Sequence, residues 1–410
     1  VGQLRAFTRK NIISEQLREF TRKSRLANRL WRSTATLTQS LNSVNASRQS
    51  LANQPISSED RILCLTASSE YFVFGSEWGH VYTYCRRLER MTRLVQATSY
   101  NPATCMHCLA QPEPVLAVGF QSGSFLLYRF PQLRKDGRRL TEAVRQVSRN
   151  VHKRPVTAIR WSGDSTKLFT GDEGGLVMVT LVHFDNQFFS PAFICQESDS
   201  VVQLDYSLGC VALSTHARAV LVHIAQRDST VEQIGSMKRK CNGPFGVTFL
   251  TAPNQQNDTA DSNNHFNNDV TCPRIATTRP GCRIWLADLN GHVFETILCK
   301  QQGLQMVPQI SANVAIFESP FLDKKQYLLN VQQRSVVCRL DLRDIQPSLR
   351  IIDVAAVEDS EELILLLNDY RLINFDAVFR PFEIGCLQQY RIVGDVRLDG
   401  KQREEHLNSK

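Results

Sequence analysis

The chain has 410 residues, of which 42% are hydrophobic, and its formal net charge is +8 at pH 7. That hydrophobic share is ordinary for a soluble globular protein, and the longest apolar run, residues 363–367, is far too short to cross a membrane as a helix. The charge is concentrated at the start, because residues 1–33 contain nine Lys or Arg against two Glu.

Residues 1–33 are predicted to form a basic amphipathic helix, because their apolar side chains recur along one helical stripe. Such a helix can lie on anionic lipid, enter a partner's groove, or cover the rest of the protein with its apolar face. A cleaved mitochondrial presequence is a further alternative. The residues expected to contact a membrane or partner are Arg18, Arg22, Lys23, Arg25 and Arg29.

A polar segment, residues 34–55, is rich in Ser, Thr, Asn and Gln and is predicted to be a linker.

After this linker, one pattern recurs seven times: an apolar run, turn-forming residues and a second apolar run. Glycines in the three clearest copies are expected to supply the positive φ angles of tight turns. Those copies span residues 72–84, 116–128 and 168–179, and the weaker ones span 211–222, 275–285, 327–338 and 364–375.

The residues that begin these turns are spaced 38 to 64 apart, which brackets the repeat of a WD-type propeller blade. A further apolar stretch precedes each hairpin, so each unit has at least three strands. For the sixth and seventh units these stretches are residues 314–317 and 351–354. A four-stranded blade needs one more strand, and residues 94–97 and 193–195 are candidates for this fourth strand in two of the earlier units.

These features predict an all-β fold, a seven-bladed WD-repeat-like β-propeller over residues 56–376 with an N-terminal basic helical extension. A pair of β-sandwich domains is the structural alternative. Residues 252–273 are polar and Asn-rich and are expected to be a disordered loop, and residues 377–410 are expected to be a C-terminal extension.

The twelve cysteines mostly fall inside predicted strands, as small buried hydrophobes do, and this usage suggests a reducing cytosol. Cys105 and Cys108 form the sequence's C-x-x-C motif, for which zinc binding is the alternative to a structural role. In a strand, residues three apart point to opposite faces, and no second Cys or His pair has suitable spacing. We therefore expect no metal site.

No phosphate-binding loop, dinucleotide fingerprint or nucleophile elbow occurs, so we predict no enzyme, no cofactor and no small-molecule substrate. Asp172 and Glu173 form the most prominent carboxylate pair, but both are expected in water at a hairpin tip. Lys238, Arg239 and Lys240 form a basic run in a predicted loop and are expected to contact a partner or membrane. Nucleic-acid binding is not expected, because no stacking aromatics accompany the basic runs.

Two strings in this part of the chain are distinctive: Val202, Gln203, Leu204, Asp205 and Tyr206 belong to the first, and Arg279, Pro280, Gly281 and Trp285 to the second. Val202, Leu204 and Tyr206 are also expected to share one strand face. The second string is expected to begin with a turn and continue as a strand. Together the two strings resemble the WD-type propeller family shared by tectonin-repeat proteins and Hermansky-Pudlak syndrome 5 proteins.

The resemblance implies a cytoplasmic, non-catalytic scaffold, peripheral on endomembranes, with trafficking, coat or autophagy components as partners. One branch of the family acts in autophagy, and the other is a subunit of a complex that builds lysosome-related organelles. The sequence ends without tectonin repeats, so binding of ubiquitin-like autophagy proteins by this chain is not expected from the resemblance. The alternatives are an organelle-biogenesis subunit and a propeller that binds membranes through its basic helix.

Overall fold

The computed structural model describes residues 60–88, 90–131, 143–224, 229–235, 239, 243–250, 274–280, 283–298, 305–311, 314–318, 326–330, 335–340, 350–357, 362–375, 381–386 and 392–395. All of them belong to one compact unit, Gln54–Lys410. The predicted helix at 1–33, the linker and the loop at 252–273 lie outside the described residues. The regular secondary structure that is described consists of β-strands, as the sequence predicted.

Strands β1 to β28 form seven antiparallel sheets of four consecutive strands each, and β29 Ile392–Asp395 adds a parallel fifth strand to sheet 1. Sheet 1 contains β1 Ile62–Ala67, β2 Tyr71–Ser76, β3 Val81–Cys85 and β4 Arg90–Val95, and sheet 2 contains β5 Ala103–Leu109, β6 Val115–Phe120, β7 Phe125–Arg129 and β8 Val144–Ser148. Sheet 3 contains β9 Val156–Trp161, β10 Lys167–Asp172, β11 Leu176–His183 and β12 Phe188–Gln196. Sheet 4 contains β13 Val201–Ser207, β14 Cys210–Thr215, β15 Ala219–Ile224 and β16 Ser229–Gln233. Sheet 5 contains β17 Val247–Leu250, β18 Arg274–Arg279, β19 Arg283–Ala287 and β20 Val293–Leu298. Sheet 6 contains β21 Gln305–Ser311, β22 Val314–Glu318, β23 Gln326–Asn330 and β24 Ser335–Leu340. Sheet 7 contains β25 Ile351–Val357, β26 Glu362–Leu367, β27 Arg371–Phe375 and β28 Pro381–Cys386.

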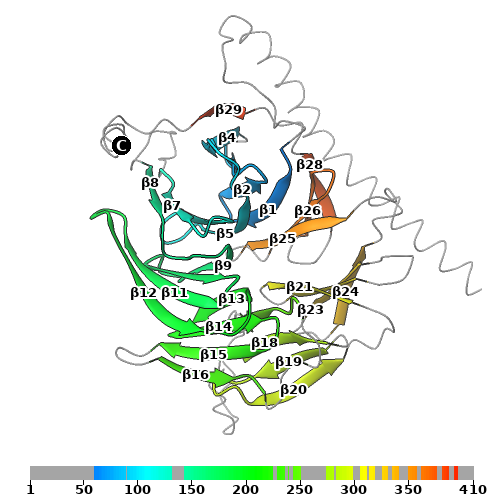
Figure 1. The fold of residues 1–410 in the computed structure, drawn as a ribbon. Coiled ribbons are helices and arrows are strands. Elements are labelled where there is room, and N and C mark those ends of the chain that lie inside the picture. The colour runs from blue at the N-terminus through cyan, green and yellow to red at the C-terminus, as the bar shows by residue number, and fades with distance from the viewer. Residues whose placement is uncertain are drawn as a thin grey trace, which may run out of the picture. The chain divides into compact units, whose positions relative to one another are not determined.

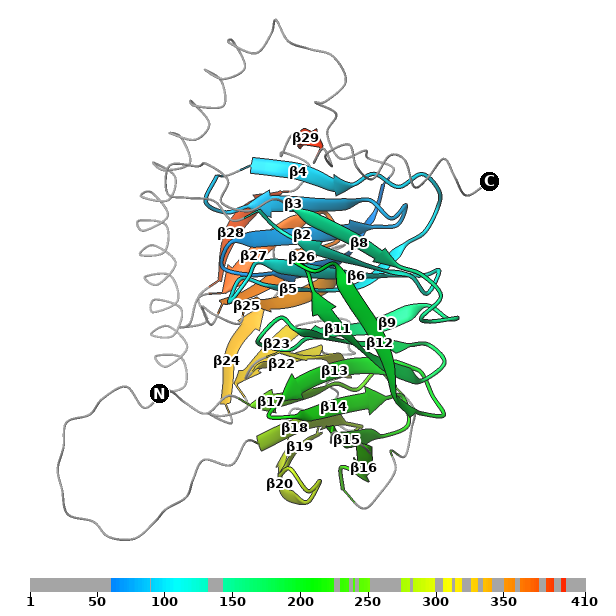
Figure 2. The same ribbon diagram turned by 90° about the vertical axis from the view of Figure 1, so that its left-hand side faces the viewer.

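The sheets close into a ring. The first strand of each sheet lies beside the first strand of the next, and β25 of sheet 7 lies beside β1 of sheet 1. Figure 1 shows these first strands nearest the centre, with outer strands such as β12, β16 and β20 at the periphery. Figure 2 shows consecutive sheets stacked face to face. The unit is therefore a β-propeller, and two stacked sandwich layers are excluded.

The described core lies between neighbouring sheets, and sheets 1 to 4 each bury apolar side chains on both faces. One apolar cluster joins sheets 7 and 1, where Ile364 and Leu366 pack with Phe72 and Phe74. Further clusters join sheets 1 and 2, 2 and 3, 3 and 4, and 4 and 5. Phe169 and Ile284 are fully buried. Closure of the ring thus buries the faces that would otherwise end the stack.

A β-bulge recurs near the start of the first strand in sheets 1, 2, 3, 4 and 7. Two of the bulged residues carry hydroxyl groups that bond to the next sheet: Thr104 donates to the carbonyl of Val156, and Thr157 donates to the carbonyl of Val201 at 2.6 Å. The bulge shifts the alternation of side chains by one residue. The unpaired residues are Leu63, Thr104, Thr157, Val202 and Ile352.

This bulge corrects the expectation that Val202 shares a face with Leu204 and Tyr206. Val202 is itself the bulged residue and is half-buried, whereas Val201 is buried and joins the core with Leu204. Tyr206 packs against the same core and stacks on Phe169, with ring centroids 4.6 Å apart. Because the bulge adds one residue to the strand, the residues before it point to the face opposite to the one that strict alternation predicts.

Glycines in the clear repeats have two separate roles. Gly79, Gly123 and Gly175 have the positive φ that was expected of turn glycines. Gly171, at the end of a second strand, instead permits close approach: a Cβ there would lie 2.6 Å from Cγ1 of Val201 in the next sheet. At the matching position of sheet 4, the hydroxyl of Ser214 donates to the carbonyl of Phe245, so a polar bond replaces the close contact.

Two boundaries differ from the prediction. In sheet 6, residues 314–317 belong to the second strand, because the first is β21, whose Pro308 and three polar residues gave no apolar signal. The fourth strand of sheet 7 is β28, beyond the expected end at residue 376. A further strand, β29 Ile392–Asp395, pairs in parallel with β4 and adds a fifth strand to sheet 1.

Candidate interaction surface

One end of the ring carries the turns between second and third strands and also the segments that lead from each sheet to the next. We call this end the connection face. In sheet 1 the two features touch, because the main-chain N–H of Asn101 donates to the carbonyl of Trp78. Gly79 in the turn has a φ of 93° and lies directly against Asn101. Loops held in this way present a rigid surface to a partner.

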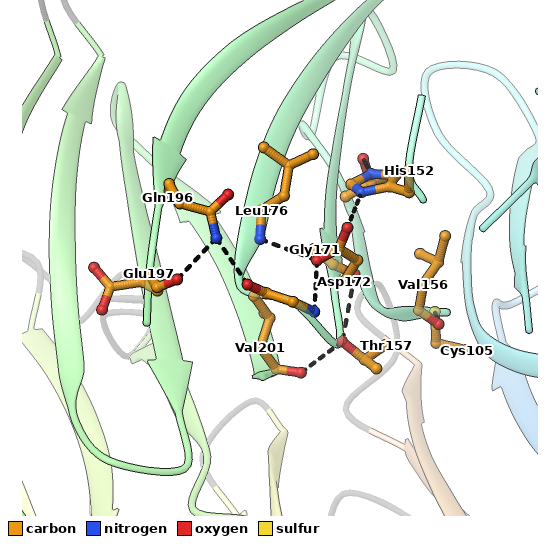
Figure 3. A network of polar contacts seen from close by, with 12 residues as sticks. Cys105, His152, Val156, Thr157, Gly171, Asp172, Leu176, Gln196, Glu197 and Val201 are labelled. Atoms are coloured by element: carbon orange, nitrogen blue, oxygen red, sulfur yellow. Dashed lines mark hydrogen bonds and ion pairs between the residues drawn. The ribbon is translucent and has the colours of Figure 1, made fainter. Parts of the chain in front are cut away.

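The turn of sheet 3 is held by a buried polar network (Figure 3). Asp172 Oδ1 accepts the main-chain N–H groups of Gly174 and Leu176 at 2.9 and 3.0 Å, and Oδ2 contacts His152 Nδ1 at 2.9 Å. His152 Nε2 lies 2.7 Å from the hydroxyl of Thr170. Burial lowers the pKa of His152, opposed by its bond to Asp172. Asp172 is therefore a buried structural residue, and the expectation that it lies in water was wrong.

Two aromatic side chains are exposed together on the connection face. Trp78 belongs to the β2–β3 turn and Tyr100 to the segment between β4 and β5, and their exposed fractions are 49% and 57%. The rings meet edge to face with centroids 5.6 Å apart and planes at 84°. Trp and Tyr supply a large apolar area at low entropic cost and are enriched at binding hot spots.

The support beneath this aromatic pair is rigid. Asp60, which is buried, accepts the main-chain N–H of Trp78 at 3.3 Å on Oδ1 and the hydroxyl of Tyr82 at 3.1 Å on Oδ2. Burial raises the pKa of Tyr82, and the charge of Asp60 adds to this. A surface that is ordered before binding loses little entropy when a partner docks. The sequence signal for this site was a Trp at a hairpin tip, where polar residues are the norm.

A second apolar surface lies on the outer rim of sheet 3. Phe188 and Phe193 of β12 are 50% and 64% exposed, and Leu181 of β11 is 39% exposed. Pro191 in β12 removes one backbone donor from this sheet edge. The rim is thus better suited to side-chain contact than to the addition of a partner's strand.

The two strings that carry the family resemblance lie in neighbouring sheets, 4 and 5. Asp205 of β13 joins them: its Oδ2 accepts the N–H of Phe249 at 2.7 Å and the hydroxyl of Thr248 at 2.8 Å. Its Oδ1 lies 2.9 Å from Nε of Arg160 in sheet 3. One buried carboxylate thus links three sheets.

In the second string, Arg279 ends β18 and Trp285 lies in β19, with Arg279 Cζ 3.8 Å from the ring centroid. Pro280 is half-buried in the turn that follows Arg279. Ile284 is fully buried and Trp285 is half-buried. Gln203 is half-buried in β13, and Gly281 lies outside the described residues.

The predicted basic contact residues have different outcomes. Arg18, Arg22, Lys23, Arg25, Arg29, Lys238 and Lys240 lie outside the described part of the chain. Arg239 is described and is only 6% exposed. It is buried and not exposed in a loop, because its guanidinium reaches back to the β14–β15 turn and is covered there. Its contact with a partner stays a prediction.

Cys105 and Cys108 point to opposite faces of β5, as predicted. Cys105 packs in the cluster between sheets 2 and 3, and Cys108 in the cluster between sheets 1 and 2. Burial raises the pKa of the Cys105 thiol to about 12. Within the described ranges no group of three or more His, Cys, Asp and Glu side chains could hold a metal ion. None of the described elements is a helix long and apolar enough to cross a membrane.

A closed ring of four-stranded sheets, with turns fixed by buried polar networks, defines a WD-repeat-like β-propeller. Comparison with known proteins agrees with this class. The chain is 28% identical over 243 residues to human tectonin beta-propeller repeat-containing protein 2, which covers 58% of the chain and 16% of that protein. No protein-family profile matches the chain.

Two insect proteins are also similar. The WD repeat-containing protein CG11141 of Drosophila melanogaster is 24% identical over 277 residues, or 65% of this chain and 35% of that protein. The BLOC-2 complex member HPS5 homolog of Anopheles gambiae is 26% identical over 295 residues, or 67% of this chain and 32% of that protein. The chain therefore spans about a third or less of the length of each of these relatives.

Proposed function

We propose that this propeller is a non-catalytic scaffold that gathers proteins in autophagy and in endolysosomal and secretory vesicle traffic. The observation that carries the proposal is the rigid ring with an exposed aromatic pair, in a chain similar to a BLOC-2 complex member. The partner is a protein subunit of a coat, tethering or organelle-biogenesis complex. The protein acts in the cytoplasm, at the surface of endomembranes.

Trp78 and Tyr100 are the residues at which such a subunit would dock. Truncation of a buried hot-spot aromatic costs about 2 kcal/mol or more, which is a factor of roughly 30 in Kd. Leu88 offers a matched control, because it is also 49% exposed on sheet 1 but lies in the β3–β4 turn at the opposite end of the ring.

The test is quantitative affinity purification from cells that express the protein, W78A/Y100A or L88A. We expect trafficking-complex subunits to be recovered with the unaltered protein and with L88A, and to be lost with W78A/Y100A. Recovery of no such subunit would contradict the scaffold function. Equal recovery with W78A/Y100A would contradict the assignment of the surface alone.

A second candidate function is peripheral membrane binding, which the nine basic residues of segment 1–33 favour. Flotation with vesicles that contain phosphatidylserine tests it. Binding is expected to fall as salt rises, because exposed charges are screened, and to be lost in a protein that begins at Gln54. Equal flotation of the shortened protein would exclude this role for the segment.

A further inference from the structure

A buried arginine lies where sheet 4 leads into sheet 5. Arg239 is in the segment between β16 and β17 and is 6% exposed. Its Nη1 donates to the carbonyls of Thr215 and Arg218, and its Nη2 donates to the hydroxyl of Ser214 at 2.8 Å. Its Cζ lies 5.0 Å from the ring centroid of Phe245. Nε is buried and has no hydrogen-bond partner.

Two part-buried arginines of this protein, Arg218 and Arg86, reach carboxylates. Arg218, on the same face, binds Glu197 through two contacts of 2.8 and 2.9 Å. Arg86 contacts Glu362 at 2.8 Å, in the ion pair that bridges sheets 1 and 7. Arg239 contacts only neutral oxygens among the described residues. An ionised group is costly to bury without an opposite charge, and no carboxylate within the described ranges contacts Arg239.

A second buried cation lies beside the first. Arg279 is 6% exposed and lies over Trp285, whose ring also lies against Gly235. Burial, and next the charge of Arg279, lower the pKa of Arg239 to about 9. Burial, and next Arg283, lower the pKa of Arg279. Arg239 remains charged at neutral pH, so positive charge accumulates at one point of the connection face.

We propose that Arg239 and Arg279 bind a phosphate group carried by a side chain of a partner protein, a phosphoserine or phosphothreonine. A guanidinium has five N–H donors, and the contacts of Arg239 occupy three, which leaves Nε–H and one N–H of Nη2. A phosphate dianion supplies the missing charge and several strong acceptors.

The burial of both guanidiniums favours a phosphorylated side chain over a membrane. A single side chain can approach a covered guanidinium, whereas a planar array of lipid headgroups meets exposed cations first. The proposal extends the scaffold function but does not rest on it, because a phosphate would bind here whatever process the partner serves. Failure to recover trafficking subunits and failure to bind phosphate are therefore separate outcomes.

The test uses isothermal titration calorimetry of the full chain with O-phosphoserine, with serine and inorganic phosphate as comparison ligands at constant ionic strength. Since Arg239 also holds the β14–β15 turn, R279Q is the main variant and R239K is a second one. The matched control is R274Q, because Arg274 is exposed at the opposite end of the same strand and also lies over an aromatic ring, that of Phe294.

We expect phosphoserine to bind and serine not to bind. The Kd for phosphoserine should rise roughly tenfold or more in R279Q and R239K and stay within about twofold in R274Q. Inorganic phosphate that competes with phosphoserine and depends on Arg279 would support the same site. No binding of phosphoserine by the unaltered protein, or equal losses in R274Q and R279Q, would overturn the proposal. Arg279-dependent flotation on phosphatidylinositol-phosphate vesicles without phosphoserine binding would overturn it as well.

Discussion

Replacement of Gly171 by alanine tests how tightly adjacent sheets pack. The new Cβ would lie 2.6, 2.9 and 3.0 Å from three carbon atoms of Val201 in sheet 4, whereas carbon atoms pack best at roughly 3.5–4.0 Å. Val201 is 1% exposed and has little room to move. Overpacking of this kind costs about 1–3 kcal/mol, which exceeds the gain of about 0.4–1 kcal/mol from a stiffer unfolded chain.

Gly163 provides the control in the same sheet. A Cβ there meets no atom within 4 Å, and its φ is not positive. G163A should therefore be neutral or slightly stabilising, whereas G171A should lower the urea midpoint at an unchanged m-value. Equal midpoints for the two variants would refute the proposed packing.

A double-mutant cycle strengthens this test. V201A removes two buried methyl groups and should cost about 2 kcal/mol by itself. In G171A/V201A the new methyl group fills part of the space left by Val201. The double variant should be more stable than the sum of the single effects by about 1 kcal/mol or more, and strict additivity would show that the two residues do not touch.

Two further predictions concern buried polar groups. D205A should destabilise the protein by about 1–3 kcal/mol in urea unfolding, because it leaves the buried Phe249 N–H without its acceptor and removes the carboxylate beside the part-buried Arg160; a cost near that of a surface substitution would contradict the link between sheets. The lowered pKa of His152 means that the unfolded chain binds its proton first, so stability is complete above about pH 6.5 and falls as pH decreases. Between about pH 7.5 and 5.5, H152Q should show a shallower loss of unfolding free energy than the unaltered protein, and parallel curves would contradict this.

Much of the ring was predictable from sequence because local signals mark it. Apolar runs separated by turn residues located the hairpins, and their spacing gave the number of sheets. The first strand of sheet 6 was missed because Pro308 and polar residues interrupt it. The predicted strand face of Val202 was wrong, because a bulge cannot be recognised in a sequence pattern of alternating residues.

The candidate sites were harder to predict because they depend on which segments meet in space. Arg239 was expected at the surface from its basic neighbours, but its burial depends on Ser214 and Thr215, more than twenty residues away. Asp172 was expected in water because its sequence position is a turn, and the histidine that buries it comes from the preceding connection. Trp78 and Tyr100 form a pair only once sheets 1 and 2 are adjacent.

The most direct test of the closed ring is a cross-link between its first and last sheets. Arg86 Nη2 and Glu362 Oε2 are 2.8 Å apart although 276 residues separate them in sequence. R86C/E362C should therefore react with a short bismaleimide to give an intramolecular product, identified by mass spectrometry of the joined peptides. R86C/E232C should not, because Glu232 lies in sheet 4. Absence of the 86–362 product, or equal yields of the two, would contradict the closed propeller.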